Sequence, residues 1–500
     1  MAEITKSNVL SMMQETTEGT LKAEDSGADF IPLRAGYSMS GAFNSVDSDE
    51  LVAGDLGASK SFTADEVPTA SIPFYLRGSG VEGQEPEIGK LFHGVMGEKS
   101  AAATEYALLA GSTVSILKVA SGDNFKVGQA VLIKDDTNGW EVRMINSISG
   151  NDLILNYNLS VAPAVGVTLG KAICYSPGLS HPSFSVHRYQ AAAAGSAFKD
   201  SMAGAKVNSL GLTFAANGLG EGTAELAGLE YFWNPIVIDA SNNKFDFNDG
   251  SVRAATISNG TYKTPMALAA EIQSKGDALA TNDLTCSYDN LTGKFTIAIN
   301  TGTLSLLWQT GANTAASIAA AIGFDNAADD TGATSYVGDN TIALKPAYTP
   351  SYDASESVMI KGAQFLLGDS TVINCTKASN VEFSIESTVN RVPSVCASTG
   401  IDSTVATERA VSMSATLLLS KYDATIMDKF FNNKDTQMQF VAGPKDAAGK
   451  WKVGKVSTIA LANASITAHT IAEADGYHVV NLEAKAFVGS NRSDCYINFL

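Results

Sequence analysis

The sequence has little charge and few basic residues. Charged residues make up 17% of its 500 positions, against about 25% in typical soluble domains. The net charge is -18, and the sequence contains no cluster of Lys or Arg. Because a protein that holds duplex DNA needs a basic face to neutralise phosphates, this composition argues against DNA binding of that kind.

The sequence also lacks the patterns that mark common catalytic and metal sites. Its cysteines never form CxxC, no histidine pair has the HExxH spacing, and no G-x-S-x-G run occurs. Residues 449–456 (GKWKVGKV) approach a phosphate-binding loop but end in valine where Ser or Thr should reach the metal. We therefore predict no catalytic, metal or cofactor site, and a protein that is not an enzyme.

Targeting and membrane signals are missing as well. The first 20 residues have no basic start followed by an apolar core, so we expect no signal peptide. No apolar run approaches the ~20 residues of a membrane-spanning helix. The five cysteines are scattered and odd in number, which favours a reducing compartment over a disulfide framework: Cys174, Cys286, Cys375, Cys396 and Cys495.

What the sequence does have is strand alternation. In 381–389 (VEFSIESTV) apolar and polar residues alternate, and similar runs occur at 71–76, 206–214, 411–419 and 477–489. A period of two gives a strand one dry and one wet face. Helical spacing is limited to 86–97, 264–280, 312–323 and 423–433, the last with Asp423 as N-cap. The fold class predicted is mainly β.

The order of these elements repeats along the chain. Residues 37–97 read as strand, polar loop, strand and short helix, and 381–435 repeat that order; paired strands then follow at 204–228 and 453–489. A general all-β rhythm could imitate such a repeat. We predict two tandem sandwich domains with two inserts: 1–100 and 176–233 for the first domain, 101–175 for an inserted small β-barrel, 234–348 for an inserted α+β module, and 349–500 for the second domain.

The second domain resembles the tail tube proteins of long-tailed bacteriophages. The resemblance rests on residues 410–444 (AVSMSATLLLSKYDATIMDKFFNNKDTQMQFVAGP), 452–466 and 477–489, and on the order of elements rather than an invariant motif. It implies a virion protein, made in the host cytoplasm, whose rings stack into the conduit for genome delivery. Its partners would be further copies of itself, a tape measure protein, tail terminator or distal tail proteins, and viral DNA that passes without specific binding.

The resemblance also implies a ring size: single-copy subunits of this family form rings of six, so a chain with two copies would form a ring of three that mimics six. A ring of six chains is the alternative. A channel that passes DNA should be polar and negative, so that phosphates do not stick. Candidate lumen-lining acids are Asp47, Asp49, Glu50, Asp55, Glu382 and Glu386. The competing interpretation is that they are ordinary solvated loop acids, and residues 351–500 are nearly neutral, with 15 acidic and 13 basic side chains.

Other functions stay open at this point. The chain could be another tail, baseplate or decoration protein, a carbohydrate-binding adhesin, or a hydrolase whose carboxylate pair only a structure would reveal. If it forms a tube, we expect the inserts to project outward, which favours a non-contractile tail without a sheath. The first 30 residues and 490–500 are candidate arms between rings, because termini are usually mobile unless a neighbour holds them.

Overall fold

The computed structural model describes residues 8–48, 60–102, 104–190, 198–342, 344–353, 355–368, 374–375, 378–397, 399–418, 424–474, 476–489 and 493–500. Strands dominate, and these residues include three α-helices, so the prediction of a mainly-β chain is confirmed. The chain divides into a larger unit (Met12–Phe184, Gly204–Leu229 and Pro350–Leu500) and a smaller unit (Met1–Ser11, Ser185–Ala203 and Glu230–Thr349). No described helix is both long and apolar enough to cross a bilayer.

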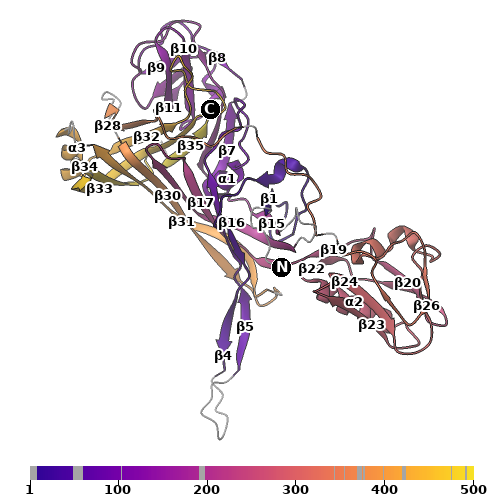
Figure 1. The fold of residues 1–500 in the computed structure, drawn as a ribbon. Helices are drawn as coiled ribbons and strands as arrows, with labels where there is room; N and C mark the ends of the chain where they lie inside the picture. Colours follow the sequence, from indigo (N-terminus) through magenta and orange to yellow (C-terminus); the bar gives the residue numbers. More distant parts are fainter. Residues whose placement is uncertain are drawn as a thin grey trace. The chain divides into compact units, whose positions relative to one another are not determined.

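The larger unit contains one long antiparallel sheet, whose strands are coloured from indigo to yellow in Figure 1. Its hydrogen-bonded order is β3–β6–β17–β16–β30–β31–β34–β33. We call it the eight-stranded sheet. The strand bounds are β3 Ser38–Ser40, β6 Thr69–Tyr75, β17 Glu221–Ala227, β16 Phe198–Ala215, β30 Ala378–Pro393, β31 Ile401–Leu418, β34 Tyr477–Ala486 and β33 Ser457–Ala474.

Between β3 and β6 the chain forms a further hairpin, β4 (Phe43–Asp47) with β5 (Ser61–Glu66). Figure 1 shows it as a two-stranded ribbon that extends away from the rest of the larger unit. Every residue of β4 is exposed, including Phe43 and Val46.

A second sheet in this unit ties down the C-terminus. Its order is β7–β14–β35–β33–β32–β28, joined by antiparallel pairing throughout. The bounds are β7 Gly97–Ala102, β14 Ala172–Pro177, β35 Cys495–Phe499, β32 Thr436–Ala442 and β28 Gln364–Gly368. All five residues of β35 are buried. The expectation that 490–500 form an arm between rings is therefore wrong for the described part of that segment, 493–500, because its backbone and side chains are used inside the fold.

The prediction of an N-terminal arm is wrong for two short strands, whereas most side chains of residues 16–29 are partly or fully exposed. Strand β1 (Val9–Gln14) buries Leu10 and Met12 completely, and β2 (Phe30–Ile31) is also buried. Residues 1–7 lie outside the described part of the chain.

A small sheet lies within residues 106–169, inside the span predicted for a β-barrel insert. Six short strands pair in the order β8–β13–β10–β11–β12–β9 and share a hydrophobic cluster of their own. Their bounds are β8 Tyr106–Ala107, β9 Ile116–Lys118, β10 Ala130–Asp135, β11 Gly139–Ser149, β12 Asp152–Leu155 and β13 Thr168–Leu169.

Two of the three helices pack beside the larger unit's sheets. Helix α1 (Gly89–Met96) follows β6, as the spacing at 86–97 predicts, and its Phe92 ring meets the Phe74 ring edge-on at 6.0 Å. Gly97 ends this helix with φ of 89°, a left-handed conformation that glycine adopts without strain. Helix α3 (Ala424–Phe431) follows β31 in the same way. The proposed N-cap, Asp423, lies outside the described residues.

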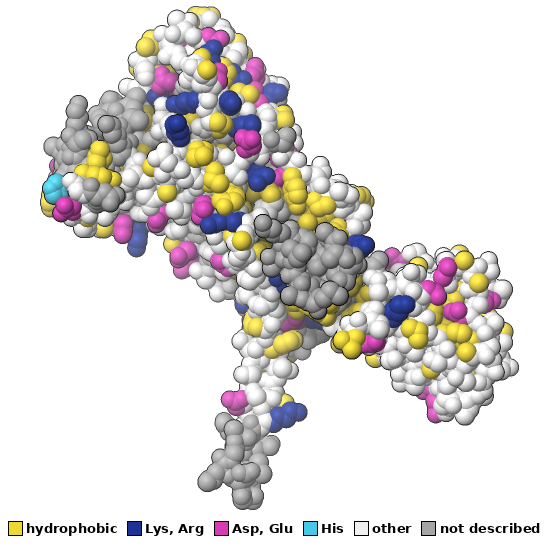
Figure 2. All heavy atoms as spheres, viewed as in Figure 1, with side chains coloured by type: hydrophobic (Ala, Val, Ile, Leu, Met, Phe, Trp, Pro, Cys, Tyr) yellow, Lys and Arg dark blue, Asp and Glu magenta, His cyan; other side chains and the backbone are white. Residues whose placement is uncertain are grey.

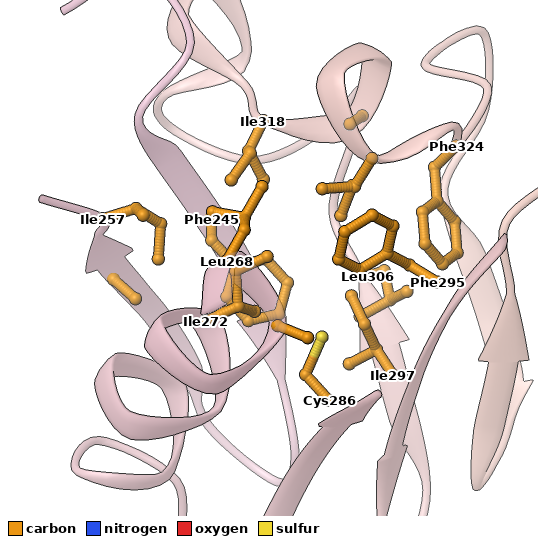
Figure 3. Packing of buried hydrophobic residues seen from close by; sticks show 14 of the residues in the cluster. Phe245, Ile257, Leu268, Ile272, Cys286, Phe295, Ile297, Leu306, Ile318 and Phe324 are labelled. Atoms are coloured by element: carbon orange, nitrogen blue, oxygen red, sulfur yellow. The ribbon is translucent and has the colours of Figure 1, made fainter. Parts of the chain in front are cut away.

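The smaller unit holds an α+β arrangement around its own core, shown in Figure 3. Its helix α2 (Pro265–Asp277) begins at Thr264, whose side chain accepts a hydrogen bond from the Ala267 N–H, and it packs on strand β23. Strand bounds are β15 Phe184–Gln190, β18 Glu230–Trp233, β19 Ile236–Ile238, β20 Lys244–Asn248, β21 Val252–Thr256, β22 Gly260–Tyr262, β23 Leu284–Asp289, β24 Lys294–Ile299, β25 Leu304–Leu306, β26 Asp330–Ala333 and β27 Ser335–Val337.

The helix predicted at 312–323 is wrong. The segment forms two short 3-10 turns, Thr314–Ala316 and Ala319–Ile322, separated by an extended Ser317. The Ile318 N–H donates to the Lys244 carbonyl at 2.8 Å. This bond to a neighbouring strand outweighs the helical preference of an alanine-rich segment.

Candidate assembly surface on the eight-stranded sheet

The eight-stranded sheet has one apolar and one polar face, because directly opposite residues of paired strands point to the same side. The alternation predicted for 381–389 is confirmed. Val381, Phe383 and Ile385 are buried to 2% exposure or less, whereas Glu382 and Glu386 are exposed. The same apolar face meets α1 through the Phe74–Phe92 ring contact and the second sheet through the Phe214–Phe440 ring contact. This burial fixes which face each strand presents to water.

The polar face carries hydroxyl and carboxylate groups. Opposite residues join its strands by side-chain hydrogen bonds: the Ser71 hydroxyl donates to Glu225 at 2.7 Å, and the Ser384 and Ser412 hydroxyls lie 2.9 Å apart. Direct pairing places six glutamates on this face: Glu221, Glu225, Glu382, Glu386, Glu408 and Glu483.

The charge of the polar face is negative. Against the six glutamates stand two basic residues on its described strands: Lys485, opposite Ser412, and Lys206, which lies opposite Ala227 and is ion-paired to Glu18. Outside the strands, Arg34 forms an ion pair with Glu221 at 2.7 Å. The rest of the face is mostly Ser, Thr and small residues, so phosphate groups would meet few cations here.

The six acids named from the sequence are not all on this face. Glu382 and Glu386 lie on it, whereas Asp47 is exposed on the β4–β5 hairpin. Asp49, Glu50 and Asp55 lie outside the described residues. Sequence reasoning missed Glu221, Glu225, Glu408 and Glu483. The alternation in 221–227 (EGTAELA) and 477–486 (YHVVNLEAKA) carried the signal, but only the pairing shows that these strands share a face with β30.

Two long hairpins in this sheet share one register. In the first hairpin, Ser40 pairs with Thr69. Further along the same hairpin, β5 contains one extra residue, so that Ser45 of β4 lies opposite Thr63 of β5. In the second hairpin, Ser384 pairs with Ser412. Val389 is as far from Ser384 as Ser45 is from Ser40, and it lies opposite Ala406 because β31 also contains one extra residue. The extra residue therefore falls at the same place in both hairpins.

The strand pairs that follow share a register too. Strands β16 and β17 shift between Val207 and Ser209, and β33 and β34 shift between Ile466 and Ala468. Each bulge lies next to a glutamate, Glu225 or Glu483, that in turn pairs with a serine of the preceding hairpin. Bulges insert one residue and re-aim a strand, so they are specific features of a fold.

The flanking short strands continue the correspondence. Residues 200–203 of β16 pair with β18, and the matching end of β33 pairs with β35. A short helix follows the first long hairpin (α1) and the second (α3).

Within the chain, the two sets of strands join at a seam between β16 and β30. Leu210 pairs with Ile385, and Leu212 with Phe383, all four exposed by 2% or less. On the polar face of the seam, Thr213 lies opposite Glu382. An exposed sheet edge on one set is thus covered by the other.

No protein-family model matches the chain, and a search of curated proteins finds no similar sequence.

Both ends of the eight-stranded sheet remain open among the described strands. At one end β3 pairs only with β6; at the other, residues 470–474 of β33 pair only with β34. Ile471 on that last edge is 57% exposed. Open edges with unpaired backbone groups are templates for pairing with another chain. In the described residues, no group of His, Cys, Asp and Glu side chains could hold a metal ion.

Proposed function

We propose that this chain is a structural virion protein that closes into rings of three chains and stacks into a phage tail tube. Each chain would hold two copies of one tube domain, carried by β3–β18 and β28–β35. The observation that carries the proposal is the repeated register of the two hairpins and their closing strands, including both bulges. An all-β rhythm alone does not reproduce two bulges at matching positions.

The open edges support a closed ring. Closure of a sheet on itself removes every edge, and most oligomers of identical chains have closed point-group symmetry. Three chains with eight strands each would give 24 strands. With strands about 4.8 Å apart and tilted by about 40°, such a barrel would measure about 48 Å between opposite backbones. That is wide enough for a double helix to pass after side chains are added.

The polar face supports a channel lining. If it faces the lumen, each chain contributes six carboxylates to it, together with Ser and Thr hydroxyls: those of Glu221, Glu225, Glu382, Glu386, Glu408 and Glu483. Carboxylates repel phosphates, and the described strands of this face carry no basic track to bind them. DNA would therefore slide through without being held. A tape measure protein before ejection, and terminator or distal tail proteins at the tube ends, would be the other partners.

The test is the assembly state of the purified protein across concentration. Sedimentation velocity should show chains joining into species of three and then longer stacks, and negative-stain images should show tubes with an open centre. Rings that never stack would favour a decoration or baseplate protein. A strictly monomeric chain that binds glycans would favour an adhesin and refute the tube.

A further inference from the structure

We propose that neighbouring chains join by pairing β33 of one copy with β3 of the next, in the register Thr470 opposite Ser40, Ile471 opposite Met39 and Ala472 opposite Ser38. The proposal rests on the proposed ring and names the strands and residues that would make it. The partner is a second copy of this chain.

The register comes from the seam that the chain already contains. There, β16 pairs with β30, with Gly211 opposite Ser384 and Leu212 opposite Phe383. The shared bulge aligns β33 with β16, so that Ile471 corresponds to Leu212.

The matching hairpins supply the other half of the register. The pairing of Ser40 with Thr69 corresponds to that of Ser384 with Ser412, so β3 corresponds to the seam part of β30, and Met39 to Phe383. If β33 and β3 are aligned in the register that β16 and β30 have, the three proposed pairs follow directly.

The exposure of the two edges fits an absent neighbour. Leu212 is 1% exposed inside the chain, whereas its counterpart Ile471 is 57% exposed. Ser38 and Ser40 are exposed on β3, and Thr470 is exposed on β33. None of the six paired residues is charged, so no unpaired charge would be buried on contact.

Pairing also continues the polar face across the boundary between chains. Ser38, Ser40 and Thr470 all belong to that face by their pairing with Ser71, Thr69 and Asn481. The new seam would therefore carry hydroxyls where the internal seam carries Thr213, Ser384 and Glu382.

A cysteine pair tests the register directly. Beside the internal seam, the Ala216 N–H donates to the Ser379 carbonyl, so these two residues form a hydrogen-bonded pair. Hydrogen-bonded and non-hydrogen-bonded pairs alternate along antiparallel strands, which makes Gly211 and Ser384 a non-hydrogen-bonded pair with Cα atoms about 4.5 Å apart. That spacing suits a disulfide. Thr470→Cys and Ser40→Cys occupy the corresponding positions.

The experiment mixes two full-length single variants, Thr470→Cys and Ser40→Cys, in a Cys396→Ser background, because Cys396 is an exposed native thiol. After mild oxidation, the assembled mixture should give two-chain disulfide products on a non-reducing gel. The double variant should give covalent species up to three chains. A Gly211→Cys/Ser384→Cys variant is the positive control within one chain, since nothing lies within 4 Å of a Cβ added at Gly211.

An off-register pair, Thr470→Cys with Ser38→Cys, is the matched negative control and should give little product. If wild type assembles but the off-register pair links as well as the proposed pair, or neither links, the seam is refuted while the tube function stands. If wild type never self-associates at any concentration, the proposed function and the seam both fail.

Discussion

Leu212 and Ile471 form a matched pair that separates folding from assembly. Leu212 is buried in the internal seam, and Ile471 is its exposed counterpart on the open edge. Truncating a buried leucine costs about 2–5 kcal/mol through lost transfer energy and the cavity left behind. We therefore expect Leu212→Ala to lower the free energy of unfolding of the single chain by about that amount.

Ile471→Ala should behave differently. An exposed side chain contributes within about 0.5 kcal/mol to the stability of the single chain. Complete burial of an isoleucine stabilises by about 1.5–3 kcal/mol, and slightly more than half of Ile471 remains exposed, so each seam would lose roughly 1–1.5 kcal/mol. That corresponds to a fivefold to tenfold weaker association between neighbouring chains, at about 1.4 kcal/mol per factor of ten.

The assay combines urea unfolding at a concentration where chains are separate with sedimentation velocity at higher concentration. Val237→Ala, an exposed apolar residue of the smaller unit, is the control and should change neither measurement. The reasoning is refuted if Ile471→Ala destabilises the single chain as much as Leu212→Ala does, or if it leaves association at the wild-type level.

Three further predictions concern the inserts, the polar face and the smaller unit. Replacing 104–170 by a short turn should leave assembly intact, since β7 and β14 already pair up to Ala102 opposite Ala172; loss of assembly, with the fold retained by circular dichroism, would contradict a dispensable module. Glu382→Lys with Glu386→Lys should leave the melting temperature within a few degrees, since both side chains are exposed, but make assembled rings retain duplex DNA in a salt-sensitive gel shift; no retention at low salt would count against a lining role. Burial raises the pKa of Asp249, but hydrogen bonds donated by the Thr281 and Asn282 backbones outweigh it, so the pKa lies below the ordinary 3.8. Because the folded pKa is depressed, this stabilisation is complete above the unfolded pKa and is lost as pH falls through the folded one. Asp249→Asn should therefore cost about 1–3 kcal/mol at neutral pH and flatten the acid-side loss in a thermal melt of the smaller unit below about pH 4; an unchanged acid limb would contradict it.

The sequence predicts what depends on local pattern. Alternation located β30, β31 and β34, and helical spacing located α1, α2 and α3, because burial of one face fixes the period of each element. It failed at 312–323, where a backbone bond to Lys244 decides the conformation. No local pattern in the alanine-rich segment reveals that partner.

The candidate surface was only partly predictable. Glu382 and Glu386 could be placed on a wet strand face from alternation alone. The union of β16 with β30, and hence the seam and the open edges, depends on pairing between residues more than 160 positions apart in the chain. The C-terminal segment shows the same limit. Its position at the end of the sequence suggested an arm, although β14 and β33 enclose its five-residue strand β35.

The most direct test of the tube account is cryo-electron microscopy of the concentrated protein, with rotational symmetry determined from end-on views. The account predicts stacked rings of three chains, each ring showing six similar lobes around an open channel. Rings of six chains would contradict the internal duplication, and dispersed single chains would contradict the tube itself.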